Sequence, residues 1–348
     1  MTQERPTQRD SVTDEPAEEP IVAAADAGAE VAEAAEHARL DRDLLRGTLL
    51  GLTSAVLYTC TNACLRYVSH CDVYWVSCLK AFPTMTLAAV ILLLDRRPGR
   101  KLPFTPLMAL GLYLTGLLAH VGGNVAFQWG LGIVGLAATV PLTFSLLLIA
   151  GALLSKFWLG EAITRQTVIA ITLLTGAFIC VCLHTRLVAT QPVDGVAEFP
   201  IATVAWAVAA VCFSGIAYAV LGAVVRRTVT GTASVAAVLF MIGFSGVTSL
   251  GGIALGRMGL SGILATAPGD WAMMLTAGTL NAVAFFALTR AMQLVTVSYV
   301  NIVNASQVAM AAVAGVVLFH ERTTLWLAGG LALTVAGLVT NRRPSKRR

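Results

Sequence analysis

Residues 73–94 read VYWVSCLKAFPTMTLAAVILLL, a mostly apolar stretch in which Lys80 is the single charge. A helix crosses the hydrocarbon core of a bilayer with about 20 residues, so this stretch is long enough to span it. Backbone polar groups find no partner in lipid, and a spanning segment of this length is therefore predicted to be a helix. The whole chain has the same character, because only 12% of its 348 residues are charged, against about 25% in a soluble domain.

Ten apolar segments of this kind occur along the chain, and breaks rich in Gly, Pro or Arg separate them. Mean hydropathy over a window of about 19 residues is the usual signal for such spans. The expected fold class is an all-α integral membrane protein with ten transmembrane helices. The predicted spans are 47–68, 73–94, 106–129, 134–157, 164–183, 201–225, 233–256, 271–291, 296–319 and 324–341.

The sequence also contains an internal repeat. A shift by 160 positions aligns four pairs without a gap: Ser54 with Ser214, Tyr58 with Tyr218, Arg66 with Arg226, and Glu161 with Glu321. Five spans per half is an odd number, so the halves have opposite orientations, as in the inverted repeats of many secondary transporters. We expect two five-helix repeats, at 46–186 and 200–341.

Two charged tails flank these repeats. Residues 1–45 are acidic and rich in Ala, Glu and Pro, so we expect a tail that is disordered or only partly helical. Residues 342–348 are basic. With the N-terminus inside, 17 basic residues close to the spans fall on the cytoplasmic side and four outside. This bias predicts a multi-pass protein of the cell inner (plasma) membrane with both termini in the cytoplasm.

Two stretches carry a family resemblance. Residues 288–340 (LTRAMQLVTVSYVNIVNASQVAMAAVAGVVLFHERTTLWLAGGLALTVAGLVT) and their weaker twin at 131–181 each place a Glu-containing corner between a span and a Gly-bearing span. This resembles the drug/metabolite transporter superfamily, specifically its EamA-type ten-helix proteins. The resemblance implies small metabolites that cross through one central cavity by alternating access, with export as the common direction. The first half departs in one detail, because Ala162 stands where Arg322 follows Glu321.

Lys80 is the main charge predicted to lie inside the membrane. All 19 acidic residues fall in the tail, in loops or at span edges, so no carboxylate at span depth is available to pair with it. Its side chain either reaches the headgroups by snorkelling or faces a cavity and binds a substrate anion. The lack of buried acids also argues against a transporter of hydrophobic cations, which needs an acid to neutralise its substrate.

Other polar residues within the spans are candidates for the cavity wall, because such groups usually face the bundle interior. His120, Asn124 and Gln128 share one helical face at intervals of four, and His120 is a candidate for substrate binding or protonation. An equally good interpretation is that these groups hold helices together. The predicted substrate-binding residues are Lys80, His120, Asn124, Tyr58, Asn62, Tyr218, Asn281, Asn301 and Asn304.

Glu161 and Glu321 stand just before the fifth and tenth spans. A carboxylate at a helix N-terminus accepts hydrogen bonds from free amide groups. We therefore expect each to cap the span that follows it. The seven cysteines show no CxxC pairing, so no metal site is expected.

These observations favour a secondary transporter of a small anionic or zwitterionic metabolite, such as an amino acid. A flippase of a phosphate-bearing lipid or polyprenyl carrier is the alternative, since Lys80 would suit a phosphate as well. A membrane-embedded enzyme fits poorly, because only His120 of the five histidines lies in a span. No Walker motif is present, so a proton or an exchanged substrate is the expected driving partner. The other expected partners are the substrate and the lipid bilayer, without nucleic acid, cofactor or catalytic residue; the oligomeric state stays open.

Overall fold

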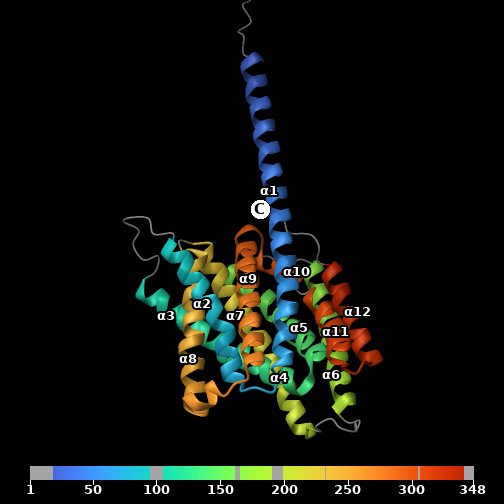
Figure 1. Cartoon of the computed structure of the whole chain (residues 1–348). Coiled ribbons are helices and arrows are strands. Elements are labelled where there is room, and N and C mark those ends of the chain that lie inside the picture. The colour runs from blue at the N-terminus through green and yellow to red at the C-terminus, as the bar shows by residue number, and fades with distance from the viewer. Residues whose placement is uncertain are drawn as a thin grey trace, which may run out of the picture. The chain divides into compact units, whose positions relative to one another are not determined.

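The computed structural model describes residues 19–94, 105–160, 165–189, 199–231, 233–304 and 306–340, and its regular structure there is entirely helical. Figure 1 shows the elements. In chain order they are α1 (Glu19–Tyr67), α2 (Val73–Leu94), α3 (Pro106–Leu117), the π-helix η1 (Leu118–Val125), α4 (Ala126–Val134), α5 (Leu136–Leu159), α6 (Arg165–Ala189), α7 (Ile201–Val229), α8 (Val235–Leu264), α9 (Pro268–Leu294), α10 (Val297–Asn304), α11 (Gln307–Phe319) and α12 (Leu325–Thr340).

The chain divides into two compact units, residues 1–45 and 46–348. In the first unit, helix α1 begins at Glu19, so the described part of the tail is helical. The expectation of a tail that is disordered or only partly helical stays a prediction. Ala and Glu are strong helix formers. A helix that continues from a stable span also needs no new nucleus, so the segment before the span stays helical. Residues 1–18 and the basic tail 342–348 lie outside the described part.

The second unit confirms the ten-helix membrane fold. Nine helices of the described chain are long and apolar enough to cross a membrane, and the shorter apolar helix Leu325–Gly337 supplies the tenth. The predicted span 73–94 coincides with α2. The third span differs, because α3, η1 and α4 form one run from Pro106 to Val134 with a π-helical middle. The ninth differs as well, because it is divided into α10 and α11.

The helices pack as an inverted repeat predicts. Under the 160-residue shift, α2 corresponds to α8, α5 to α10 and α11, and α6 to α12, and each of these pairs is in direct contact. Helix α3 packs on α8 much as its counterpart α9 packs on α2. The pairs α2–α8 and α6–α12 are therefore contacts between the two halves.

The corner at Glu321 corrects one expectation. Glu321 caps α5 of the other half rather than α12, because its carboxylate accepts hydrogen bonds from the backbone N–H groups of Leu136 and Ala137, both at 2.7 Å. The preceding Gly135 has φ +83°, and a Cβ there would lie 2.7 Å from the Glu321 Oε1 atom. Glycine is therefore needed for both the conformation and the close approach. Glu161, the repeat counterpart of Glu321, lies outside the described residues.

Arg66 completes this corner. Its Nε atom donates to Glu321 Oε1 at 3.1 Å, and its Nη1 atom donates to the Leu131 carbonyl at 3.1 Å. The corner thus joins the end of α1, the end of α4, the start of α5 and the α11–α12 connection at one end of the bundle. Its repeat counterpart Arg226 makes a similar backbone contact, donating to the Val295 carbonyl at 2.8 Å.

Candidate functional site

A cavity of about 140 Å³ lies between the two halves. Its lining residues come from α1, α2, η1, α4, α5, α7, α8, α9, α10 and α11, and none comes from α3, α6 or α12. Eight of the nine predicted substrate-binding residues line it: Tyr58, Asn62, Lys80, His120, Asn124, Tyr218, Asn281 and Asn304. The ninth, Asn301, lies in α10, but its side chain is outside the described part of the structure.

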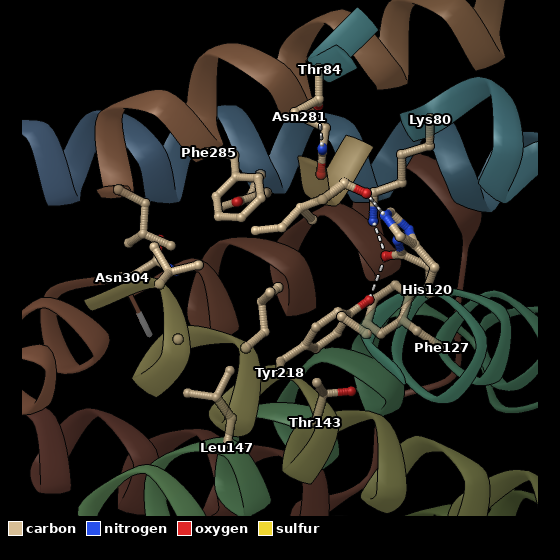
Figure 2. Close-up of a pocket in the computed structure, with 18 of the residues that line it drawn as sticks. Lys80, Thr84, His120, Phe127, Thr143, Leu147, Tyr218, Asn281, Phe285 and Asn304 are labelled. Carbon is tan, nitrogen blue, oxygen red and sulfur yellow. Dashed lines mark hydrogen bonds between the residues drawn. The ribbon is translucent and has the colours of Figure 1, made fainter. Parts of the chain in front are cut away.

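Lys80 faces this cavity and does not snorkel to the membrane surface. Its side chain is 8% exposed, and its Nζ atom donates to Asn124 Oδ1 at 2.9 Å (Figure 2). The Nζ atom also lies 6.0 Å from the centre of the Phe127 ring, a distance at which a cation is attracted to a ring face. Among the described residues, no carboxylate forms an ion pair with it.

A chain of hydrogen bonds extends from Lys80 through Asn124 to α8. Asn124 Oδ1 also accepts from the Tyr218 hydroxyl at 2.6 Å, and its Nδ2 atom contacts His120 Nδ1 at 2.8 Å. His120 Nε2 lies 3.0 Å from the Ile242 carbonyl. A carbonyl only accepts and an amide nitrogen only donates, so Nε2 carries the proton and Nδ1 accepts. His120 is therefore neutral in this arrangement and both of its nitrogens are engaged, which suits a residue that positions Asn124.

Two glycines make this chain possible. A Cβ at Gly123 would lie 2.7 Å from the Tyr218 ring, and a Cβ at Gly246 would lie 2.5 Å from His120 Nε2. Both distances are far below ordinary contact, so side chains at these positions would push Tyr218 and His120 away. The π-helical winding of η1 adds a second effect, because it changes which residues share a face. Gln128, predicted on the same face as His120, is buried and donates to the Leu65 carbonyl instead.

A second polar group lies where α10 and α11 meet. Asn62 donates from Nδ2 to Gln307 Oε1 at 3.4 Å, and Gln307 donates from Nε2 to the Asn304 backbone carbonyl at 3.1 Å. The Asn304 side chain is 5% exposed, and its Oδ1 atom has no hydrogen-bond partner in the structure. This acceptor is buried and has no hydrogen-bond partner among the described residues, and a buried polar atom without a partner is uncommon.

The wall between the two polar groups is largely apolar. Figure 2 shows Lys80 and Asn304 well apart, with the Phe285 ring between them in this view and Leu147 on the opposite wall. Asn281 adds one polar contact there, donating to Thr84 Oγ1 at 3.4 Å. The cavity therefore has a cation at one place, a group of side-chain amides at another, and apolar side chains in between.

Several lining residues were not identified from the sequence, among them Thr84, Phe127, Thr143, Phe144, Leu147, Phe285 and Gln307. Two could have been found by helical spacing, since Thr84 follows Lys80 by four residues and Phe285 follows Asn281 by four. Gln307 is a polar residue of the ninth span that was not assigned to the cavity, and the other four are apolar or weakly polar groups that resemble ordinary core residues. Only the packing of the helices distinguishes them.

Comparisons with known proteins agree with this architecture. Residues 205–342 match the EamA-like transporter family. A crystal structure described only as that of a protein is similar with a TM-score of 0.60 and 15% sequence identity, over 84% of this chain and 95% of the other. At that identity the likeness concerns the fold. No curated protein matches the sequence.

Proposed function

We propose that this membrane protein is a transporter that carries a small zwitterionic metabolite, an amino acid being the best fit; residues 205–342 match the EamA-like transporter family, of the drug/metabolite transporter superfamily. The cavity lies between the two halves and is lined by both. Alternating access around one such site is the usual behaviour of inverted-repeat transporters. Coupling to a proton or to an exchanged substrate, and export from a cytoplasm that holds both termini, belong to the same proposal.

The observation that carries the proposal is the buried ammonium of Lys80, whose partners are neutral. A buried charge without a counter-ion is costly, and ionisable residues within a membrane usually mark a substrate path. A substrate carboxylate that binds Lys80 supplies the missing negative charge. The Tyr218–Asn124–His120 chain holds the lysine head group in place for that contact.

The substrate ammonium is assigned to the other polar group. The free Oδ1 atom of Asn304 is a neutral acceptor, and it lies at the C-terminal end of α10. The carbonyl end of a helix carries partial negative charge, which favours a cation. A substrate that spans the two groups places its apolar part against Phe285 and Leu147. The arrangement thus supports a molecule with a carboxylate, an ammonium and an apolar body.

The test is transport by the purified full chain in proteoliposomes. Counterflow is measured for three matched sets: amino acids, the amines that lack the carboxylate, and the carboxylic acids that lack the amine. We expect amino acids to be carried best and the amines to be carried at least tenfold less well. Equal transport of the amines would contradict the role of Lys80, whereas movement of a labelled phospholipid without any amino acid would favour the flippase. Efflux and uptake assays in vesicles of known orientation give the direction.

A further inference from the structure

Three potential metal ligands meet at the end of the bundle where α1 leads into α2. His70 and Cys71 lie in the short connection between these helices, and Asp270 lies in the first turn of α9. One ligand atom from each residue lies within 4.8 Å of the other two. His70 Nε2 is 3.2 Å from Asp270 Oδ2, and the Cys71 Sγ atom lies within 4.8 Å of both residues' ligand atoms.

The backbone around the cluster is well defined. The Cys71 N–H donates to the Val68 carbonyl at 3.1 Å, which closes the turn. Trp75 and Trp271 then pack edge to face with ring centres 5.1 Å apart, so the start of α2 is held against the start of α9. The two segments that carry the ligands, 200 residues apart in sequence, are therefore held together by packing that does not depend on a metal.

Asp72, which follows Cys71 in the sequence, has other partners. Its Oδ1 atom accepts from the backbone N–H groups of Tyr74 and Trp75 at the start of α2, and its Oδ2 atom pairs with Arg257 at 3.3 Å. Asp270 has neither a capping bond nor a partner Arg or Lys in the described structure; its partners are His70 and Cys71. The carboxylate that faces the histidine and the thiol is thus the one that is free to act as a ligand.

We propose that His70, Cys71 and Asp270 form a binding site for a divalent zinc ion. An imidazole nitrogen, a thiolate and a carboxylate oxygen together suit zinc, whereas calcium and magnesium prefer oxygen ligands alone. Three protein ligands leave the fourth tetrahedral position to water. The His70 side chain is 62% exposed and that of Asp270 is 16% exposed, so the site is open on one side and an ion can enter.

Zinc binds the thiolate, so entry of the ion releases the proton of the Cys71 thiol. The ion then replaces the hydrogen bond that now joins His70 and Asp270. It would link the first half of the molecule, through the α1–α2 connection, to the second half, through α9.

The test measures metal binding and so does not depend on transport. The full chain in detergent is stripped with a chelator, reduced, and titrated with Zn²⁺ against a chromophoric chelator; Co²⁺ then serves as the spectroscopic probe. We expect one ion per chain and a thiolate-to-cobalt charge-transfer band. Cys71→Ser abolishes the band, and His70→Ala and Asp270→Asn each weaken Zn²⁺ binding at least about tenfold. The control variants Cys64→Ser and His37→Ala leave both readouts unchanged.

Absence of the cobalt band in the parent protein, or equal Zn²⁺ affinity in Cys71→Ser, would overturn the site. A second measurement on the unaltered chain covers a variant that does not fold. Zn²⁺ should slow the alkylation of Cys71 at least tenfold, as followed by mass spectrometry of that peptide, while alkylation of Cys60 is unaffected. Equal alkylation of Cys71 with and without Zn²⁺ would also reject the proposal.

Discussion

Two charged groups with little solvent exposure differ in their partners: Glu321 is partly buried and Lys80 is buried. The carboxylate of Glu321, at the corner between α11 and α12, forms an ion pair with Arg66 and accepts hydrogen bonds from two backbone N–H groups. The ammonium of Lys80, in the middle of α2, donates a hydrogen bond to the Asn124 amide oxygen and lies over the ring of Phe127. Both of these partners are neutral. The first charge is fully compensated by the protein, and the second is not.

The difference separates a structural charge from a functional one. A buried charge with an ion-pair partner and hydrogen bonds contributes to a defined packing, because removal of one member leaves the others unsatisfied. A buried charge with only neutral partners lowers the stability of the empty protein and gives a ligand of opposite charge something to bind. Four variants test this difference between Glu321 and Lys80.

The largest effect is expected for Lys80→Met. The variant removes the cation but keeps a long apolar side chain, so affinity for an amino-acid substrate should fall at least about 100-fold, which corresponds to about 2.7 kcal/mol. The melting temperature in detergent should stay the same or rise, because an uncompensated buried charge is lost. Equilibrium binding and thermal unfolding are the measurements. Lys80→Arg is the control, and a Met variant that binds as tightly as the parent would refute the assignment.

Glu321→Gln should have the opposite signature. It removes the ion pair with Arg66 and weakens the two bonds to the α5 N-terminus, so the free energy of unfolding should fall by about 2 kcal/mol. Substrate affinity should change less than about twofold, because Glu321 does not line the cavity. Asp41→Asn, at an exposed position of α1, is the matched control. A Glu321→Gln variant that is as stable as the parent but no longer binds substrate would contradict the structural role of Glu321.

Asn124→Asp gives the Lys80 ammonium a counter-ion within the protein, as Arg66 gives one to Glu321. The new carboxylate stands where the Asn124 amide contacts Lys80 at 2.9 Å, so it forms an internal ion pair that competes with the substrate. Affinity should fall about tenfold, or about 1.4 kcal/mol, without loss of thermal stability. Asn124→Ala separates the possible causes, since it removes the amide without adding charge. An Asp variant no weaker in binding than the parent would show that the substrate does not use the Lys80 charge.

Tyr218→Phe should have the smallest effect. It removes one hydrogen bond to Asn124 Oδ1 and leaves Lys80 and its direct contact unchanged. Affinity should fall about threefold, or about 0.7 kcal/mol, which is within the range of a single hydrogen bond. Tyr113→Phe, which removes an exposed hydroxyl contact to Thr248, is the control. A loss as large as that of Lys80→Met would mean that the Tyr218 hydroxyl itself binds the substrate.

Hydropathy and the repeat were enough to predict the helical membrane fold and most of the polar cavity wall. The reason is that each of these properties is local. A span is defined by about 20 successive residues, and a polar side chain in a span has few places to lie other than the bundle interior. Lys80 follows this rule. It lies within an apolar helix, and the cavity is the polar environment that its ammonium group reaches.

Partners that come from distant segments could not be predicted in this way. The sequence placed Glu321 at the start of α12, but the carboxylate reaches α5, nearly 190 residues earlier. The same limit applies to His70, Cys71 and Asp270. A search for CxxC pairs finds ligands that are close in sequence, whereas these three residues come together only in the folded chain.

The sequence alone was therefore enough to predict which segments are apolar enough to cross a membrane, their arrangement as two inverted halves, and the lack of a counter-ion for Lys80 at span depth. Packing of the helices was needed to find the faces and the partners: the π-helical turn that turns Gln128 toward the Leu65 carbonyl, the division of the ninth span at Asn304, and the groups that Glu321 and Lys80 contact. The physical reason is that burial in lipid acts on each residue separately, whereas a hydrogen bond or an ion pair needs two groups brought together by packing.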